Sequence, residues 1–404
     1  KAASALSSFT SLNLLGFNWV QGINNVVLGD SYQYIESLAG EYISISNFRK
    51  GTWKYDHEFI NGGLLADISE RRPKNIVNLL MNHFGIDYKT DDQLIKNNSK
   101  VRDLADTSAA YSFMKMGEHF MKGRYLLGSL YERKVHDKNG KEYNAIDLFT
   151  VKDGKLVFDE ENKIIDFDED TQLDFGNKVG RQLSALHGEY GELGRVALEQ
   201  GALGRMVLAY RKWIVPGIKK RFYKMEYREV AGDFREGMYI TYANFFSKFF
   251  KEMFAHGLTS SMLQWDNLTD HQKANIKRTN YEIAMFLAAT LLATFLINMK
   301  GDSDDDKLLN TVAYQAYRYK LEMSFYVNVP GAWKMLSTPA ASMSTIQSFA
   351  KLIDQLVTDP TEIYERTDRR GELKIKYDLL NTMPMLRQLY RYSDMGSELS
   401  WLQK

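Results

Sequence analysis

The chain has 404 residues, of which 44% are hydrophobic, so it is long enough to bury a substantial core in two or three structural units. Its formal net charge of +1 excludes a global electrostatic field for nucleic acid, and any such contact must depend on local basic patches. The absence of cysteine excludes disulfides, thiolate nucleophiles and cysteine-based zinc sites.

Residues 1–129 are predicted to form an N-terminal helical region. The chain begins at Lys1 rather than at a methionine, which is typical of a fragment. The stretch Ala2–Gly29 has no charged residue but is rich in Ser, Asn and Gly, so it is too polar and too diffuse for a signal peptide. We expect a pair of uncharged helices there, buried or interfacial, with Trp19 in the core rather than at a membrane boundary.

The next elements change from helices to strands. Ile76–Phe84 and Thr107–Leu130 have helical periodicity. Tight-turn signals then occur at Asp137–Gly140 and at Asp153-Gly154, and the second lies within the hairpin-like sequence FTVKDGKLVF. We therefore predict a small β-meander from Leu130 to about Phe158, within an insert over residues 130–168 that separates helical parts.

A short acidic run closes this insert. Asp166, Asp168 and Asp170 have the spacing with which some RNA polymerases hold magnesium, but the glycine of that loop and its β-rich surroundings are missing. Neither this run nor the acidic loop Gly301–Lys307 fits the calcium-binding EF-hand, because the required glycine and glutamate are absent from both. We interpret both as solvated loops.

The sequence contains none of the common catalytic templates. There is no HExxH zinc motif, no phosphate loop of the GxxxxGK(S/T) or GxGxxG type, and no GxSxG elbow. His187 lies close to Glu189, but an orienting or capping histidine beside a helix start is the favoured interpretation over an acid–base pair. We therefore expect a non-enzymatic protein with no catalytic residue, cofactor, metal or small-molecule substrate.

Helices are predicted to resume near Gln172 and to fill a central region over residues 169–300. One of them places its apolar residues on one face, and Pro216-Gly217 is predicted to end it. The favoured interpretation is a core helix with a solvated positive end; the alternative is a docking surface for DNA or phospholipid. The face residues are Leu203, Met206, Val207, Tyr210, Trp213 and Ile214, and the candidate anionic contacts are Arg205, Arg211, Lys212, Lys219, Lys220 and Arg221.

Four blocks of this sequence resemble a recurring pattern in very large virion proteins of crAss-like Bacteroides phages. They are His187–Tyr190, Gly204–Phe222, Tyr227–Tyr242 and the closing segment Gly371–Tyr392. Those proteins are similar to packaged cargo or ejection proteins, which are carried inside the particle and delivered with the genome. The resemblance covers about a third of the chain, and it brings no catalytic motif.

The most apolar stretch is Ile283–Met299, which has no charge between Glu282 and Lys300. As a helix it would be roughly 26 Å long, just short of a hydrocarbon core of ~30 Å. A fully buried helix in a bundle is the preferred interpretation, and a membrane-inserting segment is the alternative. The candidate inserting residues are Ile283, Phe286, Leu287, Leu291, Leu292, Phe295 and Leu296.

A C-terminal helical region is predicted over residues 301–404. Helices are expected over Thr311–Tyr326 and Ser344–Val357, with a turn at Asp359-Pro360. After the charged linker Arg366–Gly371, a last helix over Leu373–Tyr392 must bend or restart at Pro384.

The chain is thus predicted to be mainly α, a multi-helix assembly with one small β-meander insert. Together with the resemblance, this predicts phage cargo inside the capsid or tail that is ejected into the host and acts at its envelope. The expected partners are portal, tail or other cargo proteins, host membrane lipid and phage DNA. A static tail or portal-associated component and a fragment of a larger virion RNA polymerase are the alternatives.

Overall fold

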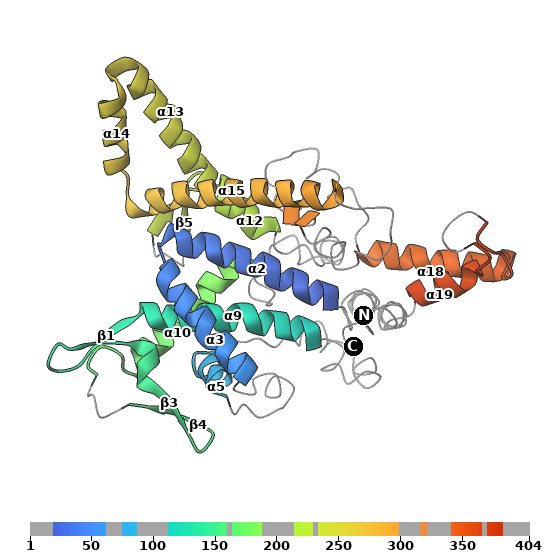
Figure 1. Ribbon diagram of the computed structural model, residues 1–404, viewed down its shortest axis with the longest axis horizontal. Helices are drawn as coiled ribbons and strands as arrows, with labels where there is room; N and C mark the ends of the chain where they lie inside the picture. Colours follow the sequence, from blue (N-terminus) through green and yellow to red (C-terminus); the bar gives the residue numbers. More distant parts are fainter. Residues whose placement is uncertain are drawn as a thin grey trace.

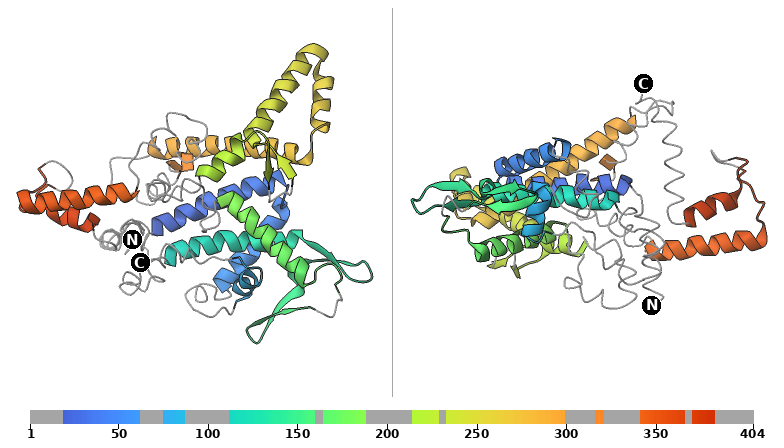
Figure 2. Two further views of the ribbon diagram at one scale, coloured as in Figure 1. Left: turned by 180° about the vertical axis from the view of Figure 1, so that it is seen from behind. Right: turned by 90° about the horizontal axis from the view of Figure 1, so that it is seen from below.

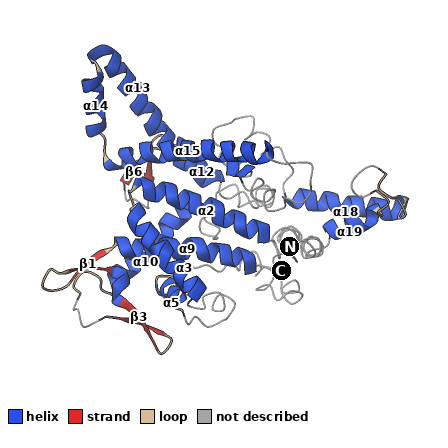
Figure 3. Cartoon of the chain, viewed as in Figure 1, coloured by secondary structure: helices blue, strands red, loops and turns tan. Residues whose placement is uncertain are grey.

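The computed structural model describes residues 19–61, 75–86, 112–159, 164–187, 214–228, 233–298, 316–317, 319–320, 341–365 and 370–382. These residues form a mainly α-helical architecture with short antiparallel strand pairs, as predicted (Figures 1 and 3). Only part of the predicted helix over Thr311–Tyr326 belongs to the described residues, and Pro384 lies outside them.

Three long helices form the base of the fold: α2 (Trp19–Ala39), α3 (Ile45–Asn61) and α9 (Ser112–Glu132). Helices α3 and α9 cross closely at two glycines, because a Cβ atom on Gly51 would lie 2.2 Å from the backbone nitrogen of Gly128. Arg124 of α9 pairs with Asp30 of α2 at 2.5 Å and with Asp56 of α3 at 2.6 Å. The glycine contact and this shared arginine therefore hold the three helices together.

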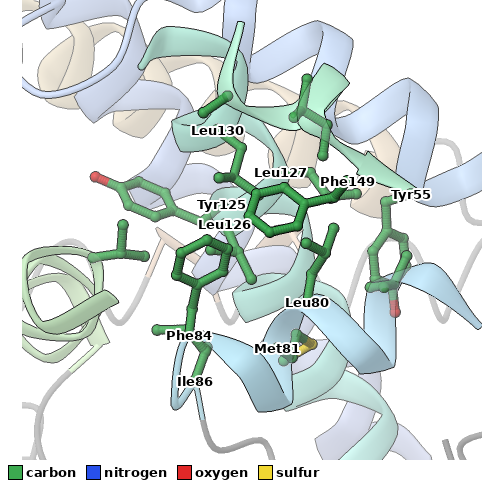
Figure 4. Close-up of a cluster of buried hydrophobic side chains, with 14 of the residues drawn as sticks. Tyr55, Leu80, Met81, Phe84, Ile86, Tyr125, Leu126, Leu127, Leu130 and Phe149 are labelled. Atoms are coloured by element: carbon green, nitrogen blue, oxygen red, sulfur yellow. The ribbon is translucent and has the colours of Figure 1, made fainter. Parts of the chain in front are cut away.

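The main core lies between these helices, the short helix α5 (Ile76–His83) and helix α10 (Glu169–His187) (Figure 4). It combines Tyr55, Leu80 and Leu127 with Phe149 from a strand and Val179 from α10, all of them buried. This single core extends across the predicted boundaries at residues 129/130 and 168/169. The insert therefore packs as an integral part of the N-terminal unit.

The predicted β-meander is replaced by two separate hairpins. Strand β1 (Lys134–His136) pairs with β2 (Glu142–Asn144), and β3 (Phe149–Lys152) pairs with β4 (Lys155–Phe158). The 3-10 helix η1 (Ala145–Leu148) interrupts the chain between them, so β2 and β3 do not pair as a meander requires. The predicted turn at Asp153-Gly154 is confirmed, and both residues have the positive φ that a two-residue hairpin loop requires.

The acidic run before α10 has a structural role. The carboxylate of Asp168 accepts hydrogen bonds from the backbone N–H and the hydroxyl of Thr171, and so caps the helix. Asp166 accepts hydrogen bonds from the backbone N–H and the ring of His136. Asp168 therefore stabilises the start of α10, and Asp166 stabilises the end of strand β1 at His136.

A second group of helices follows: α12 (Ile214–Phe222), α13 (Met238–His256), α14 (Leu258–Asp266) and α15 (Asp270–Asn298). Pro216-Gly217 was predicted to end a helix, but both residues lie in the first turn of α12. Proline is tolerated there because the N–H that it lacks would have no partner within the helix. The predicted helix preceding Ile214 lies outside the described residues. An unpredicted hairpin of β5 (Glu226–Arg228) and β6 (Asp233–Arg235) connects α12 to α13.

The second group lies on the first through α15, which runs along α2 (Figures 1 and 2). Ile35 of α2 is buried there with Ala289 of α15 and with Tyr319. Helices α13 and α14 form a hairpin that projects away from the rest of the chain.

The predicted C-terminal helix and turn are confirmed where the structure describes them. Helix α18 (Ala341–Thr358) packs on α19 (Lys374–Thr382), and Lys351 pairs with Asp378 between them. Asp359 accepts a hydrogen bond from the backbone of Thr361 in the turn after α18.

Candidate functional site

Helix α15 consists of two chemically different halves. The first half, Asp270–Glu282, carries several charged residues, whereas the second half, Ile283–Asn298, carries none. The hydroxyls of Thr290 and Thr294 donate to the carbonyls of Phe286 and Thr290 within the helix, each at 2.8 Å. These polar groups are satisfied without water, so the second half is suited to an apolar environment.

The apolar half exposes a continuous row of large side chains. Residues four apart lie on one face of a helix, and the exposed residues follow that spacing. Leu291 is the most exposed of them, at 70%. We call this surface the apolar stripe, and it consists of Ile283, Leu287, Leu291, Leu292 and Phe295. Two further candidate inserting residues face inward: Leu296 is buried, and Phe286 packs against the cluster around Ile35.

The preferred interpretation of a fully buried helix is corrected by this exposure. Over the described residues, Asp270–Leu296 is the one helical segment long and apolar enough to cross a membrane, and only 22% of its most apolar window is buried. A core helix of a soluble protein has most of its apolar surface covered. Within the part of the chain that the structure describes, no element covers this apolar surface, which extends over several turns of the second half of α15.

A buried ionic cluster holds the polar half of α15 on α2. The guanidinium of Arg278 donates to both carboxylate oxygens of Glu36, and a further ion pair joins it to Glu41. Burial alone would raise the pKa of Glu36, but Arg278 and Lys220 outweigh it and hold the pKa below its usual value. Glu36 and Arg278 are both almost fully buried. Removing one partner would leave an uncompensated buried charge, which is costly.

A second buried pair joins α12 to α15. Arg221 donates through Nε and Nη2 to the two oxygens of Glu282, each at 2.8 Å, and Tyr239 of α13 also donates to Glu282. Arg221 is only 1% exposed. Its predicted role as a surface contact for an anionic partner is therefore corrected, because its charge is neutralised inside the protein.

The other predicted basic contacts are Lys219 and Lys220 of α12 and three residues that lie outside the described part of the chain. Lys220 pairs with Glu36 at 3.7 Å, and burial lowers its pKa to about 8. Lys219 is partly exposed and lies 5.2 Å from the centre of the Tyr223 ring. Arg205, Arg211 and Lys212 lie outside the described residues. Of the three described cations, Lys219 is partly exposed while Lys220 and Arg221 pair with buried carboxylates, so these three do not form one exposed patch.

His187 is the last residue of α10, and the helix start that was predicted beside it lies outside the described residues. It is half-buried, and its Nε2 accepts a hydrogen bond from the side-chain amide of Gln33 at 2.9 Å. Burial first, with Lys122 and Lys220 adding repulsion, lowers its pKa to about 3. Glu189, its predicted acid–base partner, lies outside the described residues. Within those residues no group of three or more His, Asp or Glu side chains is placed to hold a metal.

Sequence reasoning missed the ionic cluster altogether. Glu36 and Arg278 are 242 positions apart in the sequence, so no local sequence pattern predicts their pairing. The aromatic surface of α13 was also missed, although the repeated phenylalanines of NFFSKFFKEMF are visible in the sequence.

Comparison with known proteins adds no relative to this geometry. No family model, no curated protein and no solved structure matches the chain. Functional inference therefore depends on the site itself and on the resemblance of its sequence blocks.

Proposed function

We propose that this chain is a non-enzymatic phage virion cargo protein, packaged in the particle and ejected with the genome, which acts at the host envelope. The observation that supports a role at the envelope is the apolar stripe on α15. The resemblance of His187–Tyr190, Gly204–Phe222 and Tyr227–Tyr242 to cargo proteins of crAss-like phages supports the virion origin. Other virion proteins are its partners before delivery, and lipid is its partner afterwards.

The stripe fits a helix lying in the membrane interface better than one that spans the bilayer. The apolar half from Ile283 to Asn298 is roughly 24 Å long at about 1.5 Å per residue, less than a hydrocarbon core of ~30 Å. Spanning would draw Glu282 and Arg278 toward the core and break their buried pairs. In an interfacial position, burial of each half-exposed side chain of the stripe contributes about 1 kcal/mol.

A vesicle-binding experiment tests the membrane role of the stripe. Leu287→Ser with Leu291→Ser should lower the affinity for phosphatidylcholine–phosphatidylglycerol vesicles at least about 10-fold in a flotation assay, since two such side chains contribute about 2 kcal/mol. Leu173→Ser is a matched control, because Leu173 is equally apolar and 65% exposed on α10. Equal affinity of the stripe variant and the wild type would remove lipid as the partner of α15.

The cargo role is tested on the particle. Cryo-electron microscopy of full and emptied virions should show density for this chain inside the full particle and none after genome release. Density that persists as a symmetric ring in both would instead support a static tail or portal-associated component. The second candidate is favoured by the same stripe, since an unpartnered apolar face also suits a neighbouring virion protein.

A further inference from the structure

The hairpin of α13 and α14 is anchored at its base and extends freely at its tip (Figures 1 and 2). At the base, Asn275 of α15 donates to the hydroxyl of Thr241 and to the carbonyl of Glu236. At the tip, Gly257 separates the two helices with a φ of 85°, a left-handed conformation that favours glycine. The hairpin is therefore a defined, fixed projection.

Aromatic packing stiffens the hairpin from within. The rings of Phe245 and Phe249 on α13 lie 5.8 Å apart, and Trp265 of α14 meets Phe245 edge-to-face at 6.0 Å. These distances are those of favourable aromatic pairs. The inner face of α13 is thus already occupied, and its remaining aromatic residues are not needed to close the hairpin.

Those remaining residues form an outward apolar surface. Phe250 and Phe254 are one helical turn apart on α13, and Phe254 is 84% exposed. Met262 and Leu263 are exposed on α14. A phenylalanine left in water at the far end of a projection loses the stabilisation that burial would provide. This surface therefore fits a partner outside the chain.

Two lysines accompany the apolar row. Lys248 and Lys251 are both exposed on α13. At about 100° per residue, Lys251 lies roughly 60° around the helix from Phe254. Glu252 follows Lys248 by four residues, so it lies on the same side of α13 as Lys248, and it is within 3.9 Å of His256. The outer surface thus combines two phenylalanines with Lys251 beside Phe254, and Lys248 lies further around the helix, about 120° from Phe254.

We propose that the tip of the α13–α14 hairpin docks on an anionic lipid surface. Phe250 and Phe254 enter the boundary between headgroups and acyl chains, and Lys248 and Lys251 contact headgroup phosphates. Aromatic residues beside lysines are the composition that holds helices in that layer. A protruding, convex apolar tip can enter a fluid lipid layer without a preformed groove. The inference rests on the proposed role at the envelope, but its residues are separate from the apolar stripe.

The test compares two paired variants of the whole chain on vesicles. Phe250→Ser with Phe254→Ser should weaken flotation with phosphatidylcholine–phosphatidylglycerol vesicles about 10-fold. Lys248→Glu with Lys251→Glu should abolish the preference for these vesicles over pure phosphatidylcholine. Circular dichroism and the thermal midpoint should remain close to those of the wild type, because all four side chains are exposed. Leu173→Ser again serves as the exposed apolar control.

The outcomes separate this inference from the proposed function. If the hairpin variants bind like the wild type while the variant Leu287→Ser with Leu291→Ser loses affinity, the hairpin inference is overturned and the stripe retains its role. If only the hairpin variants lose affinity, the inference is supported without the stripe. A hairpin that instead joins a second copy would give a dimer in solution that Phe250→Ser with Phe254→Ser dissociates, with vesicle binding unchanged; that result would overturn lipid docking.

Discussion

Buried polar residues decide much of the chemistry of this protein. His119 lies in the interior, where its Nδ1 is 2.6 Å from the Tyr55 hydroxyl and its Nε2 is 2.6 Å from Oδ1 of Asn78. Because that amide oxygen only accepts, Nε2 carries the proton and Nδ1 accepts from Tyr55. Burial lowers the pKa of His119 to about 3, as it does that of His187. Both rings are therefore neutral at physiological pH.

Acid should destabilise the fold through these two histidines. Their pKa is about 3 when folded and 6.5 as a model value, so the unfolded state binds more protons below pH 6.5. Their contribution to stability is complete above pH 6.5 and is lost progressively as the pH falls toward 3. When the pH is lowered from 7 to 5, protonation of each histidine in the unfolded state should lower the free energy of unfolding by about 2 kcal/mol, as measured by urea denaturation.

A single substitution isolates this effect. His119→Gln should reduce the loss of stability between pH 7 and pH 5 by about half, since one of the two histidines with a lowered pKa is gone. His256→Gln is the control, because His256 is exposed at the end of α13. A pH dependence in the His119 variant as steep as that of the wild type would contradict the assignment.

At the scale of elements, glycine spacing determines how closely α3 and α9 approach. Gly51 faces the backbone of Gly128, and Gly123 of α9 faces the ring of Tyr55. A methyl group on Gly51 has no room unless one helix moves, and one on Gly128 would lie 2.7 Å from Cδ1 of Ile43 and 3.0 Å from Cα of Phe48. The shared arginine of α9 then pairs with both neighbouring helices. Close packing and ion pairing therefore coincide at one crossing.

Gly51→Ala should lower the unfolding free energy by about 3 kcal/mol, because its Cβ would meet backbone atoms that cannot rotate away. Gly180→Ala in α10 should instead raise stability by about 0.5–1 kcal/mol, since the nearest atom is 4.0 Å from the added Cβ and alanine favours a helix. Chemical denaturation measures both changes. Similar effects of the two substitutions would show that the crossing of α3 and α9 tolerates more space than the structure has.

Over the whole molecule, the strands and helices of the first unit share one interior. Phe149 of β3 meets the rings of Phe84 and Phe158 at 5.6 Å and 5.3 Å. The first of these contacts connects a hairpin to the end of α5. A hairpin that merely decorated the surface would contribute no such side chain to the core.

Phe149→Ala should therefore destabilise the unit as a whole, by about 3–5 kcal/mol. Hydrogen exchange should show that amides of α5 and α9 lose protection together with those of β3 and β4. Val151→Ala on the same strand is the control, because its side chain is exposed and its loss should cost less than about 0.5 kcal/mol. Loss of protection confined to the hairpin would mean that residues 130–168 unfold as an independent insert.

Local patterns predicted the mainly helical class, the helix beginning at Ile76 and the turn at Asp153-Gly154, because periodicity and turn chemistry depend on neighbouring residues. They could not reveal that β2 and β3 do not pair with each other, or that Pro216 lies in the first turn of a helix. The apolar run from Ile283 was recognised as chemically unusual from its composition alone. Its exposure was not, because composition does not specify what packs beside it.

The sequence by itself thus determined where helices and turns form and which segments are apolar or charged. Only the tertiary structure decided that Arg221 is an internal ion-pair partner and that Leu291 faces outward. Both outcomes depend on elements brought together from distant parts of the chain, as Glu282 is for Arg221 and α2 is for α15. Burial is a property of packed surfaces, and a charge or an apolar side chain acquires its role only when its neighbours in space are set.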